Sequence, residues 1–119
     1  MAKKVFVFEN DPSILEVVVH ILNATGYETM ACCTQESAIA DIEQFQPHAI
    51  LLDVVFVTHQ GTELCRMLDE SPISRHIPII AFTTNRNAAA LKEICADDVV
   101  EKPFDIDQLL ESIADQISA

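Results

Sequence analysis

The chain has 119 residues, which fits one domain over residues 1–119, and half of them are apolar, which excludes intrinsic disorder. The formal net charge of −12 repels phosphate backbones, so we expect no direct nucleic-acid binding. No apolar run approaches the roughly 20 residues that a membrane span needs, and the start lacks a secretory signal. We therefore expect a cytoplasmic protein without membrane association.

Short apolar segments rich in β-branched residues predict five strands. They cover residues 4–8, 28–32, 49–52, 78–82 and 99–100. The third and fourth segments are apolar throughout, which is typical of strands that are buried on both faces of a sheet.

A segment with helical spacing of its apolar residues follows each predicted strand. Asp11 and Gly26 are the expected N-cap and C-terminal stop of the first helix, and Thr34 is the expected cap of the second. A short third helix carries Leu64, and a fourth is expected at residues 85–95. Asp105 caps the last helix, whose residues Ile106, Leu109, Leu110, Ile113 and Ile117 are expected to face inward. This alternation predicts an α/β fold, a five-stranded parallel sheet that is doubly wound with helices on both faces.

Four cysteines, Cys32, Cys33, Cys65 and Cys95, form no C-x-x-C pair and match no zinc spacing. We expect them to be reduced thiols, with metal binding or a redox role as alternatives.

Polar side chains follow the predicted strands at their carboxyl ends, where α/β sheets bind ligands: Glu9, Asn10, Asp53, Thr83 and Lys102. Adjacent carboxylates repel by roughly 4 kcal/mol at 4 Å and an effective dielectric near 20, so a cation is expected there. Oxygen atoms of Glu9, Asn10 and Asp53 suit Mg²⁺. With a lysine and a hydroxyl nearby, this set favours phosphoryl transfer to a carboxylate.

Five motifs carry a resemblance to a known family, and they occur in order at the predicted strand ends. They are residues 8–12, residues 50–53, Gly61, residues 79–83 and residues 102–104. On these motifs the chain resembles, from end to end, the receiver domain of two-component response regulators of the chemotaxis type. The resemblance implies a flavodoxin-like sheet with strand order 2-1-3-4-5.

The resemblance also implies a role for each matching residue. Asp53 is the expected phosphoacceptor, and Mg²⁺ or Mn²⁺ is expected on Glu9, Asn10, Asp53 and the backbone carbonyl of Val55. Thr83 is the expected switch hydroxyl, the Thr84 backbone N–H and Lys102 are expected at the phosphoryl group, and Pro103 is expected to follow a cis peptide bond. The phosphoryl donor would be a phosphohistidine of a sensor histidine kinase or a histidine phosphotransfer protein. Output would be binding of a further protein, with no enzymatic activity beyond the chain's own phosphorylation and slow dephosphorylation.

Several positions depart from the family pattern. Asn10 stands in place of the second acidic residue, Thr84 in place of a very small residue, and Val99 in place of the aromatic switch residue. The predicted fourth helix is also short. These departures leave open an alternative, a pseudo-receiver that binds a partner and is never phosphorylated. A hydrolase using Asp53 is disfavoured, because Val55 stands where haloacid-dehalogenase phosphatases carry a second acid.

Overall fold

A computed structural model describes residues 2–9, 11–32, 37–53, 62–72, 74–83, 96–101 and 105–118. Five parallel strands form one sheet in the order β2-β1-β3-β4-β5. The strands are β1 (Lys4–Phe8), β2 (Glu28–Cys32), β3 (Ala49–Asp53), β4 (Ile79–Thr83) and β5 (Asp98–Glu101). All five expected strands are therefore confirmed, with ends that differ by one residue at most.

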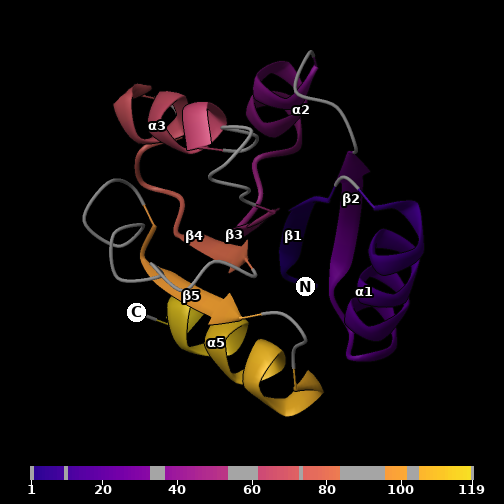
Figure 1. The fold of residues 1–119 in the computed structure, drawn as a ribbon. Coiled ribbons are helices and arrows are strands. Elements are labelled where there is room, and N and C mark those ends of the chain that lie inside the picture. The colour runs from indigo at the N-terminus through magenta and orange to yellow at the C-terminus, as the bar shows by residue number, and fades with distance from the viewer. Residues whose placement is uncertain are drawn as a thin grey trace.

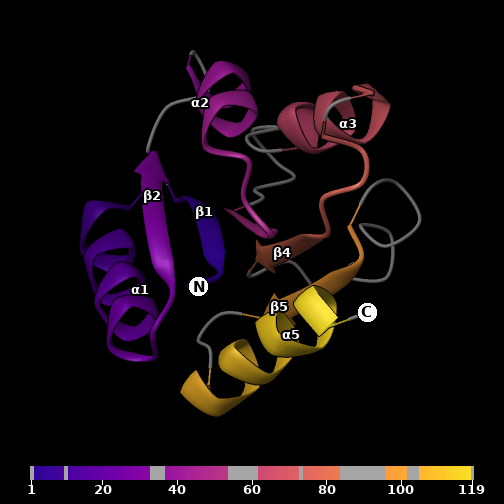
Figure 2. The ribbon, with the colours of Figure 1, turned by 180° about the vertical axis from the view of Figure 1, so that it is seen from behind.

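Helices cover both faces of this sheet (Figures 1 and 2). They are α1 (Pro12–Ala24), α2 (Ala38–Phe45), α3 (Thr62–Glu70) and α5 (Ile106–Ser118). α1 and α5 pack on one face, and α2 and α3 pack on the other. The doubly wound α/β fold is confirmed, while the expected helix at residues 85–95 and the Thr34 cap lie outside the described residues. In the described part of the chain, no helix combines the length and the apolar character that crossing a membrane requires.

Two hydrophobic cores lie on the two faces of the sheet, because successive side chains of a strand point to opposite sides. Phe6 and Phe8 of β1 pack with α2 and α3, whereas Val5 and Val7 pack with α1 and α5. Every residue of β3 and β4 is buried, as expected for strands that are covered on both faces.

The first helix begins as the sequence predicts. The Asp11 carboxylate accepts hydrogen bonds from the backbone N–H groups of Ser13 at 2.9 Å and Ile14 at 3.4 Å. At the other end Gly26 has a φ of 102°, the left-handed conformation that favours glycine after a helix. The Asp11 hydrogen bonds thus fix the start of α1 close to the carboxyl end of β1.

Replacing Asp11 by alanine is expected to lower the free energy of unfolding by about 1 kcal/mol, because two N–H groups of α1 lose their acceptor. Urea denaturation would measure the loss. Asp11→Asn is the matched control, since an asparagine side chain is an equally good N-cap. Equal destabilisation by the two substitutions would contradict this account of the cap.

Two local expectations are wrong. Ile106 was expected to face inward but is 48% exposed. It is the first residue of α5, and helical side chains tilt toward the helix N-terminus, so its side chain is directed away from the rest of the helix. Cys65, in α3, is disulfide-bonded in the structure, which contradicts the expectation of a reduced thiol at this position.

Candidate functional site

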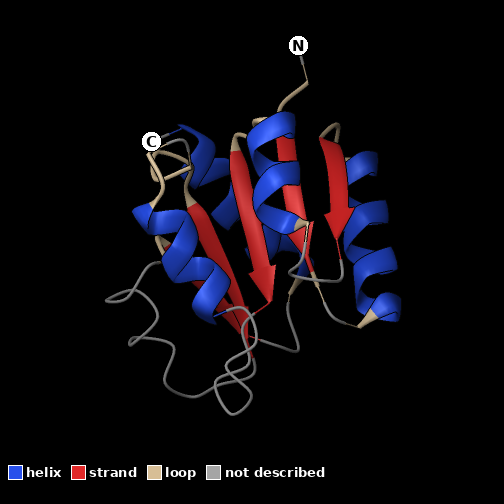
Figure 3. Cartoon of the chain, turned by 90° about the horizontal axis from the view of Figure 1, so that it is seen from above, coloured by secondary structure: helices blue, strands red, loops and turns tan. Residues whose placement is uncertain are grey.

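Three candidate site residues lie at one edge of the sheet, where the parallel strands end (Figure 3). Glu9 directly follows β1, Asp53 is the last residue of β3, and Thr83 is the last residue of β4. Their exposed fractions are 2%, 3% and 1%, respectively. Charged side chains are seldom buried to this extent without a specific reason. The tertiary structure thus brings together three of the polar residues that the sequence predicts at this edge.

Strand register places Glu9 beside Asp53. Phe8 pairs with Leu52 across β1 and β3, so the next pair along the two strands is Glu9 and Asp53. Glu9 continues the strand, because its N–H donates to the carbonyl of Cys32 at 3.1 Å. Phe8 and Leu52 both point into the core under α2 and α3, so alternation directs Glu9 and Asp53 to the α1 and α5 side. Neighbouring strands are about 4.8 Å apart, which makes the two carboxylates direct neighbours.

Thr83 reaches the same edge from the next strand. Asp53 pairs with Phe82 in β4, and Thr83 is one residue further along that strand. Thr83 in turn pairs with Glu101, the last residue of β5. Thr83 therefore ends the strand next to β3 at the same edge of the sheet as Asp53, on a rigid strand rather than on a loop, which suits a group that must meet a ligand with defined geometry.

The Glu9 carboxylate is oriented by the backbone of Asp11. Its Oε1 atom accepts a hydrogen bond from the backbone N–H of Asp11 at 3.1 Å. The sequence indicates Asp11 as a helix cap, but its only signal for this contact is an acid two residues before the N-cap. Asp11 thus both caps α1 and holds one of the two carboxylates in place.

The chemistry of this edge fits a hard divalent cation. Two buried neighbouring carboxylates repel each other and lose hydration, and a cation with oxygen ligands offsets both costs. Within the described ranges, no group of three or more His, Cys, Asp or Glu side chains is arranged to hold a metal. Glu9 and Asp53 are thus the part of the expected ligand set that the structure describes.

The remaining predicted site residues lie outside the described residues: Asn10, Val55, Thr84, Lys102 and Pro103. Their roles stay predictions from the sequence. Val99 is described, and this aliphatic residue of β5 is half-buried against the core that α2 and α3 cover.

A doubly wound parallel sheet of order 2-1-3-4-5, with buried acids where β1 and β3 end, defines a fold class, the flavodoxin-like α/β fold. The family model of the response regulator receiver domain matches residues 5–114. The chain therefore belongs to the response regulator receiver domain family of two-component systems.

Curated relatives agree with this assignment. The heme response regulator HssR of Staphylococcus saprophyticus is 32% identical over 87% of this chain and 46% of its own length. The phosphate regulon regulator PhoB of Escherichia coli is 27% identical over 95% of this chain and 51% of its own length. This chain thus spans about half the length of these curated relatives.

Two solved structures show the same fold over the whole of this chain. A response regulator from Chloroflexus aurantiacus has a TM-score of 0.91 at 23% identity, with all of both chains covered. The receiver domain of a sensor histidine kinase from Pseudomonas aeruginosa has a TM-score of 0.88 at 22% identity, again with all of both chains covered. The latter structure contains a magnesium ion coordinated in its active site cleft.

Proposed function

We propose that this chain is a phosphoacceptor receiver of a two-component phosphorelay, which takes a phosphoryl group from a phosphohistidine onto Asp53 in a Mg²⁺-dependent reaction. The donor is a sensor histidine kinase or a histidine phosphotransfer protein, and the output is binding of a further protein, in the cytoplasm. The observation that carries the proposal is the buried Asp53 carboxylate, with Glu9 beside it and Thr83 at the next strand end.

The chemistry follows from these positions. An oxygen of the Asp53 carboxylate attacks phosphorus, the bond from phosphorus to the histidine nitrogen breaks, and an aspartyl phosphate forms. The Thr83 hydroxyl donates to a phosphoryl oxygen, and the Lys102 ammonium offsets negative charge. Mg²⁺, held by Glu9, Asp53, the Asn10 side chain and the Val55 carbonyl, would neutralise charge on the transferring group. The magnesium ion of the Pseudomonas receiver supports this choice of metal.

Replacing Asn10 by aspartate is expected to raise the affinity for Mg²⁺. An amide oxygen in place of a carboxylate costs the site one negative charge, and restoring that charge is expected to tighten binding about tenfold. Isothermal titration calorimetry with MgCl₂ would compare the two proteins.

Asn23→Asp adds the same charge on the exposed surface of α1 and is the matched control. Its affinity for Mg²⁺ should equal that of the wild type. Equal affinities in the wild type and Asn10→Asp would refute the idea that Asn10 weakens the site.

The second candidate function is a pseudo-receiver, a protein-interaction module that is never phosphorylated. The observation favouring it is the half-buried Val99 on β5, which offers no aromatic ring to couple to movement of the Thr83 hydroxyl. Incubation with acetyl phosphate, with and without Mg²⁺, separates the two functions. Uptake of one phosphoryl group supports the receiver, and its absence in a folded protein supports the interaction module.

A further inference from the structure

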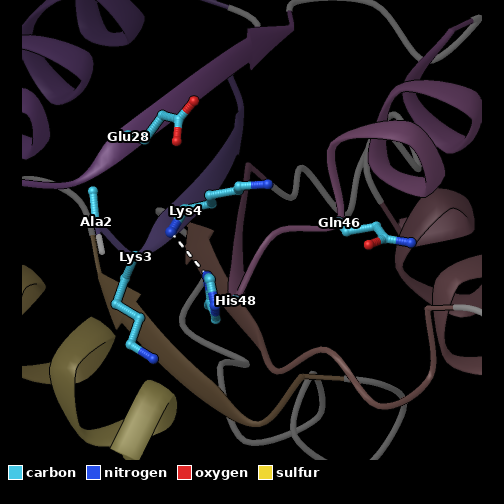
Figure 4. A pocket seen from close by; sticks show the side chains of 6 residues that line it. All are labelled: Ala2, Lys3, Lys4, Glu28, Gln46 and His48. Atoms are coloured by element: carbon cyan, nitrogen blue, oxygen red, sulfur yellow. Dashed lines mark hydrogen bonds between the residues drawn. The ribbon is translucent and has the colours of Figure 1, made fainter.

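A pocket lies at the opposite edge of the sheet from Asp53 (Figure 4). It has a volume of about 620 Å³ and is lined by Ala2, Lys3, Lys4, Glu28, Gln46 and His48. Lys4 and Glu28 are the first residues of β1 and β2, and His48 directly precedes β3. Because these strands are parallel, the pocket lies a full strand length away from the carboxylates of the candidate phosphorylation site.

The imidazole of His48 is held as a hydrogen-bond donor toward solvent. Its Nδ1 atom accepts the backbone N–H of Lys4 at 2.9 Å, and the backbone N–H of His48 donates to the Lys4 carbonyl at 2.8 Å. The side chain thus completes one more rung of the β1–β3 ladder. A neutral imidazole that accepts at Nδ1 carries its hydrogen on Nε2, so the opposite edge of the ring presents an N–H group.

Both signs of charge are present in the pocket without being paired to each other. The Lys4 ammonium is turned toward α2, where it lies 3.2 Å from the Phe45 carbonyl and 5.4 Å from the Phe45 ring centre. The Lys4 ammonium therefore already has a hydrogen-bond acceptor, the Phe45 carbonyl at the C-terminus of α2. The exposed side chains of Lys3 and Glu28 form no ion pair with another described residue, and Figure 4 shows them directed apart.

The strand register sets the spacing of these charges. Glu28 is the Cα partner of Lys4 on one side of β1, and His48 bonds to Lys4 on the other side. Two strand spacings, about 9.6 Å of backbone, therefore separate Glu28 from His48. Glu28 and His48 thus lie on either side of the start of β1, a separation that a ligand several carbon atoms long would span.

We propose that this pocket binds a small zwitterion whose carboxylate is received by Lys3 and His48 and whose cationic group is received by Glu28. A ligand of zero net charge is not repelled by a chain of net charge −12, whereas a phosphate dianion is. The volume of about 620 Å³ lies within the range of roughly 300–1,000 Å³ that is usual for small-molecule sites. The site does not depend on phosphorylation of Asp53.

The test is a titration of the whole chain with 4-aminobutyrate, followed by the backbone amide signals in two-dimensional ¹H–¹⁵N NMR. We expect saturable shifts at Lys4, Glu28 and His48. Acetate, which has the carboxylate alone, is expected to bind several-fold more weakly, and methylammonium weaker still. A dipeptide such as glycylglycine distinguishes peptide termini from a free amino acid as the source of the zwitterion.

Three substitutions test which charged residue of the pocket binds which charged group of the ligand. Lys3→Gln is expected to weaken both 4-aminobutyrate and acetate, whereas Glu28→Gln is expected to weaken 4-aminobutyrate and leave acetate unchanged. Arg75→Gln is the matched control, because Arg75 is an exposed cation that precedes β4 at the same sheet edge and lines a different pocket. No saturable shift, equal binding of acetate and 4-aminobutyrate, or an equal loss in Arg75→Gln would overturn the proposal.

Discussion

Asp53→Asn is expected to abolish uptake of a phosphoryl group from acetyl phosphate, while the wild type takes up one group in the presence of Mg²⁺. An asparagine amide has nearly the shape of the carboxylate but is not a nucleophile toward phosphorus. Mass spectrometry of the intact protein would measure the uptake. Chelating the metal should suppress the wild-type reaction as well, because the proposed Lys102 ammonium alone would then have to offset the charge of two carboxylates and a phosphoryl group.

The fold is expected to survive this substitution. Asp53 is 3% exposed beside Glu9, so removing one of the two neighbouring charges relieves repulsion in the metal-free protein. Its thermal unfolding midpoint should therefore be no lower than that of the wild type. Asp69→Asn, an identical change on the exposed surface of α3, is the control and should retain full uptake. Uptake that persists in Asp53→Asn would mean that another residue accepts the group.

The second prediction with a large expected effect concerns the stability of the fold. Phe6→Ala is expected to lower the free energy of unfolding by about 3–5 kcal/mol, because it empties a large volume from a close-packed core. Phe6 is fully buried in β1, between β2 and β3, and it packs in the core under α2 and α3. A loss of this size is a large fraction of the roughly 5–15 kcal/mol that stabilises a typical domain. Urea denaturation followed by circular dichroism would measure it.

Met67→Ala is the control for this prediction. Met67 is a large apolar side chain of α3 that is 46% exposed, and its removal is expected to change stability by no more than about 0.5 kcal/mol. If Phe6→Ala cost no more than Met67→Ala, the burial of β1 between two helical layers would not be the main source of stability.

Local patterns were sufficient for most of the secondary structure. The Asp11 cap, the left-handed Gly26 and the apolar runs of β3 and β4 depend on interactions within a few residues, so the sequence displays them directly. The alternation of strands and helices along the chain further predicted that Glu9, Asp53 and Thr83 share one edge of a parallel sheet. The structure places all three at that edge. The order of the strands, in contrast, came only from the family resemblance.

Three features required the tertiary structure. Register, which places Glu9 beside Asp53, depends on hydrogen bonds between segments about forty residues apart, and no local pattern encodes it. The pocket of Lys3, Glu28 and His48 assembles from the starts of three strands in the same way. Ile106 has the spacing of a core residue, and only the folded structure shows that this first residue of α5 lies outside the core. The sequence by itself thus determined which elements form and which polar groups end the strands, because these follow from local bonding and periodicity. Only the tertiary structure decided which of those groups become neighbours, because that depends on contacts between distant segments.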